Sequence, residues 1–457
     1  MVEFLNPHLL RRYMKGIPLK KVLFFSLPII AGQMGQMLFG TGDLLVAGRY
    51  SREVVSALGV ATTIFSPFLM LGLGLTFAIS AITSRIIGEG KKEDDMLFNS
   101  LLIAGSMGVI LSLALYLFSF KLEVFGLIRP IEDLVIQYLQ ITAISIIPAL
   151  LYQVYKEYLQ SYGHTYVSNG AILFFNVTNI ILNIVLMFGY DFGIFIIPEM
   201  GIHGAALSTV ITRTLMFLTL SAYAHKKFKM KVQVNRVRIK EILSLGMPIG
   251  LSTLSEVLVF TTVTVLVGRM NVLASASHNI VLNLGGLTFM VPLAIGSSAS
   301  VFVAEQFGKK NPQELLRYAL ACIIISTAFM SLTAIIFFAI PSPIIRLATP
   351  DPKIITYAST LLFYVALFQV PDGIQVTLWG VLRGMATTKL PLIMCIIINW
   401  LIGLPFGIYL VNEYKMQAAG LWAGLALGLT LMSVVLGFIF YCRYKSFKLA
   451  PHSGDQI

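Results

Sequence analysis

Long apolar segments constrain this chain more than any other feature of its sequence. Residues 96–120 contain no charged side chain, and residues 315–340 contain only Arg317. A helix needs about 20 predominantly apolar residues to cross the hydrocarbon core of a bilayer, so both segments are long enough. The chain is 57% hydrophobic and 12% charged, whereas soluble domains are about 25% charged. The alternating pattern of membrane β-strands is absent, so the sequence predicts an all-α integral membrane protein.

We predict twelve transmembrane helices, over residues 21–48, 54–84, 96–120, 131–156, 166–190, 201–224, 240–268, 274–305, 315–340, 354–382, 390–412 and 416–442. With the N-terminus inside, the inner side carries 24 Lys and Arg residues and the outer side carries 8. This asymmetry follows the positive-inside rule, so we expect both termini to be cytoplasmic. It also accounts for the formal net charge of +12, so we expect no nucleic-acid partner. The basic loop at 225–240 is either a linker between two halves, the simpler interpretation, or a contact for anionic membrane lipids.

The two halves of the chain resemble each other. Residues 17–49 align with residues 237–269 at a constant offset of 220, and Gly88 aligns with Gly308 at the same offset. Each half holds six predicted helices, an even number, so both halves insert with the same orientation. The pattern predicts two six-helix bundles related by an axis along the membrane normal, with substrate bound between them near mid-membrane. We place the domains at 1–230 and 231–457.

Three carboxylates fall well inside predicted helices. They are Asp43, Glu256 and Asp372. A carboxylate at the centre of a membrane helix costs about 2.5–3.5 kcal/mol to insert, so each of the three is a candidate functional residue. Carboxylates that hold a cation can exchange it for a proton or another cation. Glu157 and Glu305 lie at helix ends, where we expect them to be solvated.

The surroundings of these carboxylates favour a cation site. Pro371 removes one backbone hydrogen bond and frees a carbonyl beside Asp372. Carbonyl and carboxylate oxygens are the ligands that hard cations prefer. Asn179 and Asn183 are four residues apart and share a helix face, so their amides either complete a site around Asp43 or join helices by hydrogen bonds.

The sequence resembles the multidrug and toxic compound extrusion (MATE) family of transporters, of the NorM type. The resemblance covers nearly the whole chain. Its motifs are specific in combination, and they are "GTGDLLVAGR" (40–49), "NIILNIVLMFG" (179–189), "GIHGAALST" (201–209), "SEVLVF" (255–260), "ASHNIVLNLGGLTFMVPLAIGSSASVFVAEQFG" (276–308), "DGIQVTLWGVLRG" (372–384) and "NWLIGLPFGIYL" (399–410).

The resemblance implies a V-shaped pair of six-helix lobes that exports lipophilic organic cations by Na⁺ or H⁺ antiport. It implies that Glu256 and Asp372 bind the coupling cation, with Na⁺ a candidate ligand, and that Asp43, Asn179 and Asn183 form a coupling cluster in the N-terminal lobe. No cofactor is implied. We expect a monomer in the bacterial inner membrane.

One position departs from the family pattern. Some NorM-type members carry a tyrosine four residues before the aspartate of the tenth helix, and here that residue is Phe368. The phenol oxygen is missing, which leaves a cation–π contact. Apolar residues at cavity depth are candidate substrate contacts, alongside one polar candidate, and these residues are Met34, Met37, Phe65, Phe289, Met290 and Gln375.

Two alternatives remain open. A flippase for a lipid-linked precursor would share the two-bundle design, but it would need a strongly cationic cavity, and Arg213 is the only clear mid-helix base. An intramembrane enzyme is the more distant alternative. The six histidines and three cysteines are dispersed, and the sequence has neither a nucleophile with a base partner nor metal-ligand spacing, so we expect no enzyme.

Overall fold

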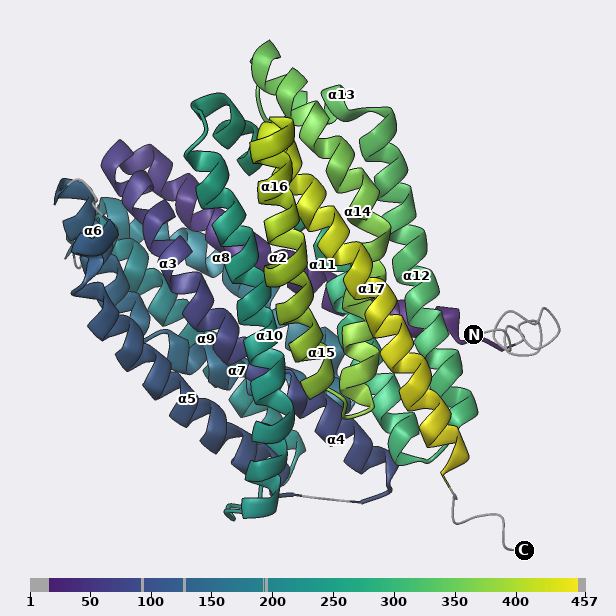
Figure 1. The fold of residues 1–457 in the computed structure, drawn as a ribbon. Coiled ribbons are helices and arrows are strands. Elements are labelled where there is room, and N and C mark those ends of the chain that lie inside the picture. The colour runs from purple at the N-terminus through teal and green to yellow at the C-terminus, as the bar shows by residue number, and fades with distance from the viewer. Residues whose placement is uncertain (1–15, 92–93, 126–128, 192, 194–195, 451–457) are drawn as a thin grey trace, which may run out of the picture. The chain divides into compact units, whose positions relative to one another are not determined.

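Helices dominate the fold (Figure 1). The computed structural model describes residues 16–91, 94–125, 129–191, 193 and 196–450. The long helices and their parts are α2 (Leu19–Tyr50), α3 (Arg52–Thr76), α4 (Ala78–Gly88), α5 (Met96–Ser119), α6 (Arg129–Ala143), α7 (Ile146–Ser161), α8 (Thr165–Phe188), α9 (Ile202–Lys227), α10 (Arg236–Gly268), α11 (Val272–Gly308), α12 (Pro312–Ala339), α14 (Pro352–Gly384), α15 (Lys389–Ile396), α16 (Leu404–Tyr414) and α17 (Gln417–Leu449). The short elements are η2 (Leu122–Phe125), β1 (Tyr190–Asp191), β2 (Ile196–Ile197), α13 (Pro341–Arg346) and the π-helix η3 (Ile397–Gly403).

Within the described residues, eleven helical segments are individually long and apolar enough to cross a membrane. Helices α3 and α4 count as one of these, and α15, η3 and α16 as another. The pair α6 and α7, which is bent by 44°, makes a twelfth. The prediction of an all-α membrane protein with twelve spans is therefore confirmed.

The chain forms two compact units, which we call the N unit and the C unit. The N unit comprises Ala31–Thr83 and Lys92–Leu254, and the C unit comprises Met1–Ile30, Ser84–Lys91 and Ser255–Ile457. The first third of α2 thus packs with the C unit, and the first half of α10 packs with the N unit. The boundary at residue 230 stays a prediction about the repeat.

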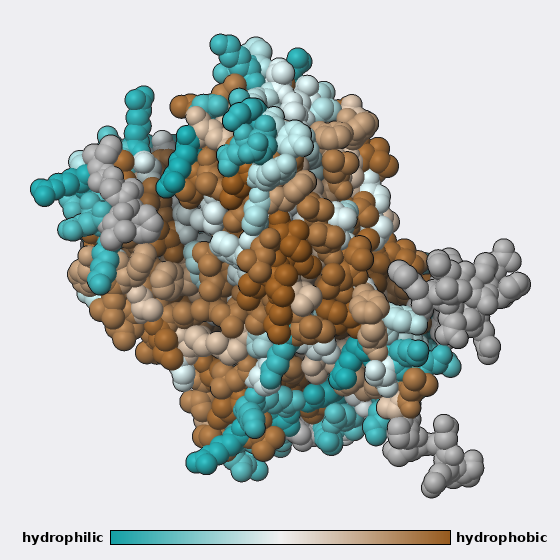
Figure 2. Space-filling view, viewed as in Figure 1, coloured by the Kyte–Doolittle hydropathy of each residue, from teal (hydrophilic) through white to brown (hydrophobic). Residues whose placement is uncertain are grey.

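Large apolar side chains lie on the outside of each unit, as lipid contact requires. Phe174 of the N unit is 68% exposed, and Leu401 and Phe438 of the C unit are 68% and 65% exposed. The face shown in Figure 2 carries an apolar band, with hydrophilic residues gathered at its two ends. Exposed apolar surface of this kind marks contact with lipid.

Helix α7 carries a buried polar stripe, contrary to expectation. Glu157, predicted to be solvated, is 2% exposed, and Lys156, counted among the inner-loop charges, is 1% exposed. The reason is that α7 continues to Ser161 and packs against α5 and α9. Gln153, one turn earlier, donates a 2.9 Å hydrogen bond to Glu157 Oε1.

In the C unit, α14 packs between α11, α12 and α17 (Figure 1). The contact with α11 is close because two glycines face each other. A Cβ on Gly380 would lie 1.9 Å from the carbonyl oxygen of Gly296. This close approach fixes the depth and rotation of α14, and so positions the polar side chains that α14 carries.

Two candidate carboxylate sites in the membrane-spanning helices

Asp43 of α2 forms the centre of a polar cluster in the N unit. Its side chain is 3% exposed. Asn183 of α8 donates a 2.6 Å hydrogen bond to Asp43 Oδ1, and Thr209 of α9 donates a 3.3 Å hydrogen bond to Oδ2. The structure therefore brings Asp43 and Asn183 together as the sequence suggested.

The asparagine amides are held by their own hydrogen bonds. Asn183 also donates to Asn179 Oδ1 at 3.2 Å, and Ser208 donates to Asn183 Oδ1 at 2.8 Å. The two amide oxygens thus accept hydrogen bonds from neighbours, and it is an amide N–H that reaches Asp43. Most polar atoms of the cluster are hydrogen-bonded, as buried polar groups usually are, whereas the buried Asn179 Nδ2 has no partner among the described residues.

Arg213 supplies a positive charge to the same cluster. It lies one turn after Thr209 on α9 and interacts electrostatically with Asp43. Its Nη1 donates a 2.7 Å hydrogen bond to Ser145 Oγ, and its guanidinium lies 4.9 Å from the ring centroid of Phe65. The sequence identified Arg213 as a mid-helix base but did not place it beside Asp43. The spacing of Thr209 and Arg213, four residues apart on one helix face, is the only signal that links them.

A cavity of about 210 Å³ opens beside this cluster within the N unit. Asp43 and Arg213 both line it, together with Tyr138 and Gln153. Among the candidate substrate contacts, Phe65 lines this cavity. Met34 and Met37 lie elsewhere on α2, and Met34 is 40% exposed.

Glu256 of α10 and Asp372 of α14 form the second site, in the C unit. Gln375 Nε2 donates a 2.8 Å hydrogen bond to Glu256 Oε1. Asp372 lies one turn before Gln375, is 7% exposed, and interacts electrostatically with Glu256. No group in the described part of the chain donates a hydrogen bond to the Asp372 carboxylate. The site therefore holds two neighbouring carboxylates, of which Glu256 accepts the amide hydrogen bond from Gln375.

The π-helix η3 lies beside this site and was missed by sequence reasoning. Asn399 Nδ2 donates to Cys395 Sγ at 3.4 Å, Trp400 Nε1 donates to Ser255 Oγ at 3.0 Å, and Cys395 interacts electrostatically with Glu256. Pro405 explains the widened turn, since it lacks the N–H that would bond the carbonyl four residues earlier. Short π-helical segments inside α-helices often occur at functional sites. The signal in the sequence was the proline in "NWLIGLPFG".

The remaining candidates lie in the C unit. Phe368 is 5% exposed and stacks on Trp422 at 6.0 Å with an interplanar angle of 4°. Phe289 and Met290 on α11 are half-buried. Within the described residues there is no group of three or more His, Cys, Asp and Glu that could hold a metal ion. The Glu256 and Asp372 pair therefore offers only two acidic ligands to a cation.

Comparison with known proteins gives consistent matches along the chain. A family model described as MatE matches residues 28–185 and 248–409. The probable multidrug resistance protein NorM of Bacillus cereus (strain ATCC 14579) is 30% identical, over 90% of this chain and 92% of its own length. The multidrug resistance protein MdtK of Proteus mirabilis (strain HI4320) is 28% identical, over 94% of this chain and 96% of its own length.

Solved structures share the fold at low sequence identity. The eukaryotic MATE transporter AtDTX14 superimposes with a TM-score of 0.84 at 18% identity, covering 94% of this chain and 98% of that one. A MOP superfamily transporter from Pyrococcus furiosus has a TM-score of 0.85 at 19% identity, covering 96% and 98%. The fold expected from the sequence is thereby confirmed.

Proposed function

Because the chain belongs to the MatE family of membrane transporters, as its motifs indicated, we propose that it exports lipophilic organic cations in exchange for Na⁺ or H⁺. The relatives named above are multidrug resistance proteins, which supports a broad range of drug-like substrates. We place the protein in the bacterial inner membrane as a monomer, with both termini in the cytoplasm.

One observation carries the proposal: the Asp372 carboxylate is buried beside Glu256, and none of the residues that the structure describes donates a hydrogen bond to it. Two neighbouring carboxylates in a membrane interior repel each other unless a proton or a cation neutralises them. Burial without hydrogen bonds adds to this cost. The pair is therefore suited to bind a cation from outside the protein, and Na⁺ and H⁺ both meet the requirement.

Coupling follows if drug and ion compete for the same charges. A lipophilic cation is held in the inward-open state by apolar surface and by the unneutralised pair Glu256 and Asp372. An ion that arrives from outside neutralises the pair, weakens the hold on the drug and favours the return step. A ligand shifts such an equilibrium only through its different affinities for the two states, so both species must interact with this pair.

The remaining predicted residues take supporting roles in this proposal. Gln375 orients Glu256, and Phe368 gives the site an aromatic wall. Asp43, Asn179 and Asn183 form a second coupling cluster, in which a proton on Asp43 would remove the charge that Arg213 faces. Adaptable apolar side chains contact the drug, and these are Met34, Met37, Phe65, Phe289 and Met290.

The flippase alternative is not favoured by the N unit cavity. A lipid-linked pyrophosphate needs a surplus of cations, and Arg213 is matched there by Asp43.

The test is transport of ethidium by purified protein in liposomes, under an imposed Na⁺ gradient or an imposed pH gradient. We expect one gradient to drive transport and Asp372→Asn to abolish it. Asp133→Asn, at an exposed carboxylate of α6, is the matched control and should transport normally. Failure of ethidium to move under both gradients, with folded protein, would refute cation antiport.

A further inference from the structure

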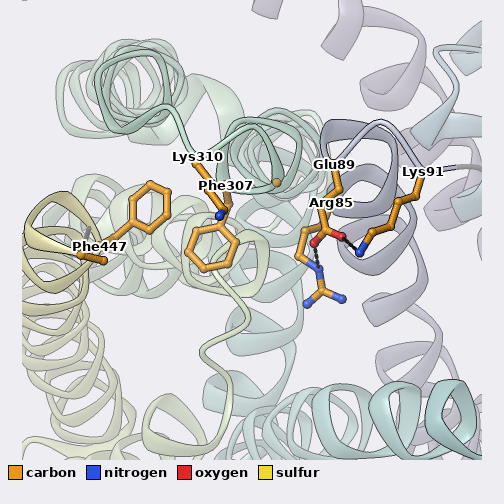
Figure 3. Close-up of a pocket in the computed structure, with 8 residues that line it drawn as sticks. Arg85, Glu89, Lys91, Phe307, Lys310 and Phe447 are labelled. Carbon is orange, nitrogen blue, oxygen red and sulfur yellow. Dashed lines mark ion pairs between the residues drawn. The ribbon is translucent and has the colours of Figure 1, made fainter. Parts of the chain in front are cut away.

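A basic and aromatic pocket lies within the C unit, where the ends of α4, α11 and α17 meet (Figure 3). Its volume is about 630 Å³. The residues that define it are Arg85, Glu89, Lys91, Phe307, Lys310 and Phe447. None of them belongs to either carboxylate site, and the proposed transport cycle does not use them.

The framework of the pocket is rigid because the ends of α4 and α11 touch through their backbones. A Cβ on Gly88 would lie 2.1 Å from the carbonyl oxygen of Glu305, and a Cβ on Gly308 would lie 2.2 Å from that of Arg85. These glycines are the pair that align in the internal repeat, so the contact is reciprocal. Lys310 follows in a left-handed conformation, with φ of 54°, which ends the helix beside the pocket.

The pocket has an excess of positive charge. Glu89 Oε1 lies 3.5 Å from Arg85 Nε, and Glu89 Oε2 lies 2.8 Å from Lys91 Nζ. Figure 3 marks both ion pairs with dashed lines. Lys310 forms no ion pair with any acidic side chain in the described part of the chain. Among the described side chains that line the pocket, three are cationic and one, Glu89, is a carboxylate.

One wall of the pocket is apolar. The rings of Phe307 and Phe447 stack with centroids 4.6 Å apart and an interplanar angle of 29°, and both side chains are half-buried. A ligand that fits must therefore combine an anionic group with hydrocarbon. Basic pockets between transmembrane helices on the cytoplasmic side are suited to anionic lipid headgroups.

We propose that this pocket binds an anionic phospholipid of the inner leaflet, with its phosphate between Arg85 and Lys310 and its first acyl carbons against Phe307 and Phe447. The assignment of the leaflet rests on the orientation given under the proposed function, whereas the binding itself does not depend on transport. Arg85 suits a phosphate because its guanidinium presents paired donors to two oxygens.

Native mass spectrometry of the purified full chain with phosphatidylglycerol or phosphatidylcholine tests this proposal. We expect phosphatidylglycerol to bind more tightly, and we expect Lys310→Gln and Arg85→Gln each to weaken it about fivefold, since one basic residue near a membrane surface contributes about 1 kcal/mol. Lys415→Gln is the matched control, because Lys415 is also exposed and also has a φ of 54°. That variant should bind phosphatidylglycerol as the unmodified chain does.

Three outcomes would overturn the proposal. They are equal binding of the two lipids, equal weakening by Lys415→Gln, and displacement of phosphatidylglycerol by inorganic phosphate at millimolar concentration, which would indicate a site for free anions. Lys310→Gln changes an exposed side chain, so its fold should be intact, and a thermal melt verifies this. Asp372→Asn should bind the lipid normally, so a failure of lipid binding is distinguishable from a failure of the transport proposal.

Discussion

The two carboxylate sites differ in how their charge is balanced. Asp43 in the N unit accepts hydrogen bonds from Asn183 and Thr209 and interacts electrostatically with Arg213. Asp372 in the C unit accepts none from the described residues, and its charged neighbour is a second carboxylate, Glu256. Both aspartates are buried to a similar degree, at 3% and 7% exposure, so burial alone does not distinguish them.

This difference indicates which of the two sites requires an ion from solution to neutralise its charge. A buried charge is tolerated when it is paired and hydrogen-bonded, and it is costly when it is not. Asp43 has both kinds of partner inside its own unit. Asp372 has neither among the described residues, so a bound cation would lower the free energy of this site more than that of the Asp43 site. This difference supports our proposal that the primary ion site lies in the C unit, with the N unit cluster in a charge-balanced supporting role.

Removing the internal partner of Asp43 should have the largest effect. Arg213→Gln removes the positive charge that interacts with the buried Asp43 carboxylate, and a buried charge left without compensation costs up to about 3–5 kcal/mol of unfolding free energy. The double variant Arg213→Gln with Asp43→Asn should recover most of that loss. Reversible denaturation in detergent measures both, and a double variant no more stable than Arg213→Gln would contradict the pairing.

Asp372→Asn, unlike Arg213→Gln, should not lower the unfolding free energy of the ion-free protein. If the proposed coupling ion binds the unmodified chain, it should stabilise the folded state by about 2.7 kcal/mol at a hundredfold excess over its dissociation constant. The substitution removes a repulsive charge, so the ion-free protein should be no less stable than before, and the stabilisation by ion should disappear. Thermal melts with Na⁺, with choline as the replacement cation, and over a pH series measure this. Persistent stabilisation in Asp372→Asn would place the ion elsewhere.

Gln375→Ala should give a smaller effect at the same site. Among the described residues, the Gln375 amide is the side chain that donates a hydrogen bond to Glu256, at 2.8 Å. A net hydrogen bond to a charged group contributes about 1.5 kcal/mol, so the half-saturating concentration of the driving ion should change by about tenfold. Gln369→Ala is a matched control on the same helix, since Gln369 bonds Thr288 and Thr333 instead. Equal changes in both variants would mean that the effect is one of packing.

The sequence predicted the fold well because membrane spans leave strong local signals. Apolar length, basic loops and the offset of 220 residues are all properties of contiguous segments. It also identified Asp43, Glu256 and Asp372, because a carboxylate in an apolar run stands out. It could not place Arg213 beside Asp43 or Cys395 beside Glu256, since those neighbours depend on how separate helices pack. The prediction that Glu157 is solvated was wrong for a related reason. Its burial depends on where α7 ends and on which helices pack over it.

Phe368→Tyr should give the smallest effect, and it tests the departure from the family pattern directly. Phe368 lies one turn before Asp372 on α14, so a hydroxyl added to its ring extends toward the same helix face. If the hydroxyl donates to the Asp372 carboxylate, the C unit site becomes more like the well-bonded N unit site. A neutral hydrogen-bond donor contributes about 1 kcal/mol, so the half-saturating concentration of the driving ion should shift about fivefold. Phe363→Tyr, at a ring that is 41% exposed on the same helix, should leave that concentration unchanged. An equal shift in both variants would show that a hydroxyl at position 368 does not act through a hydrogen bond to the Asp372 carboxylate.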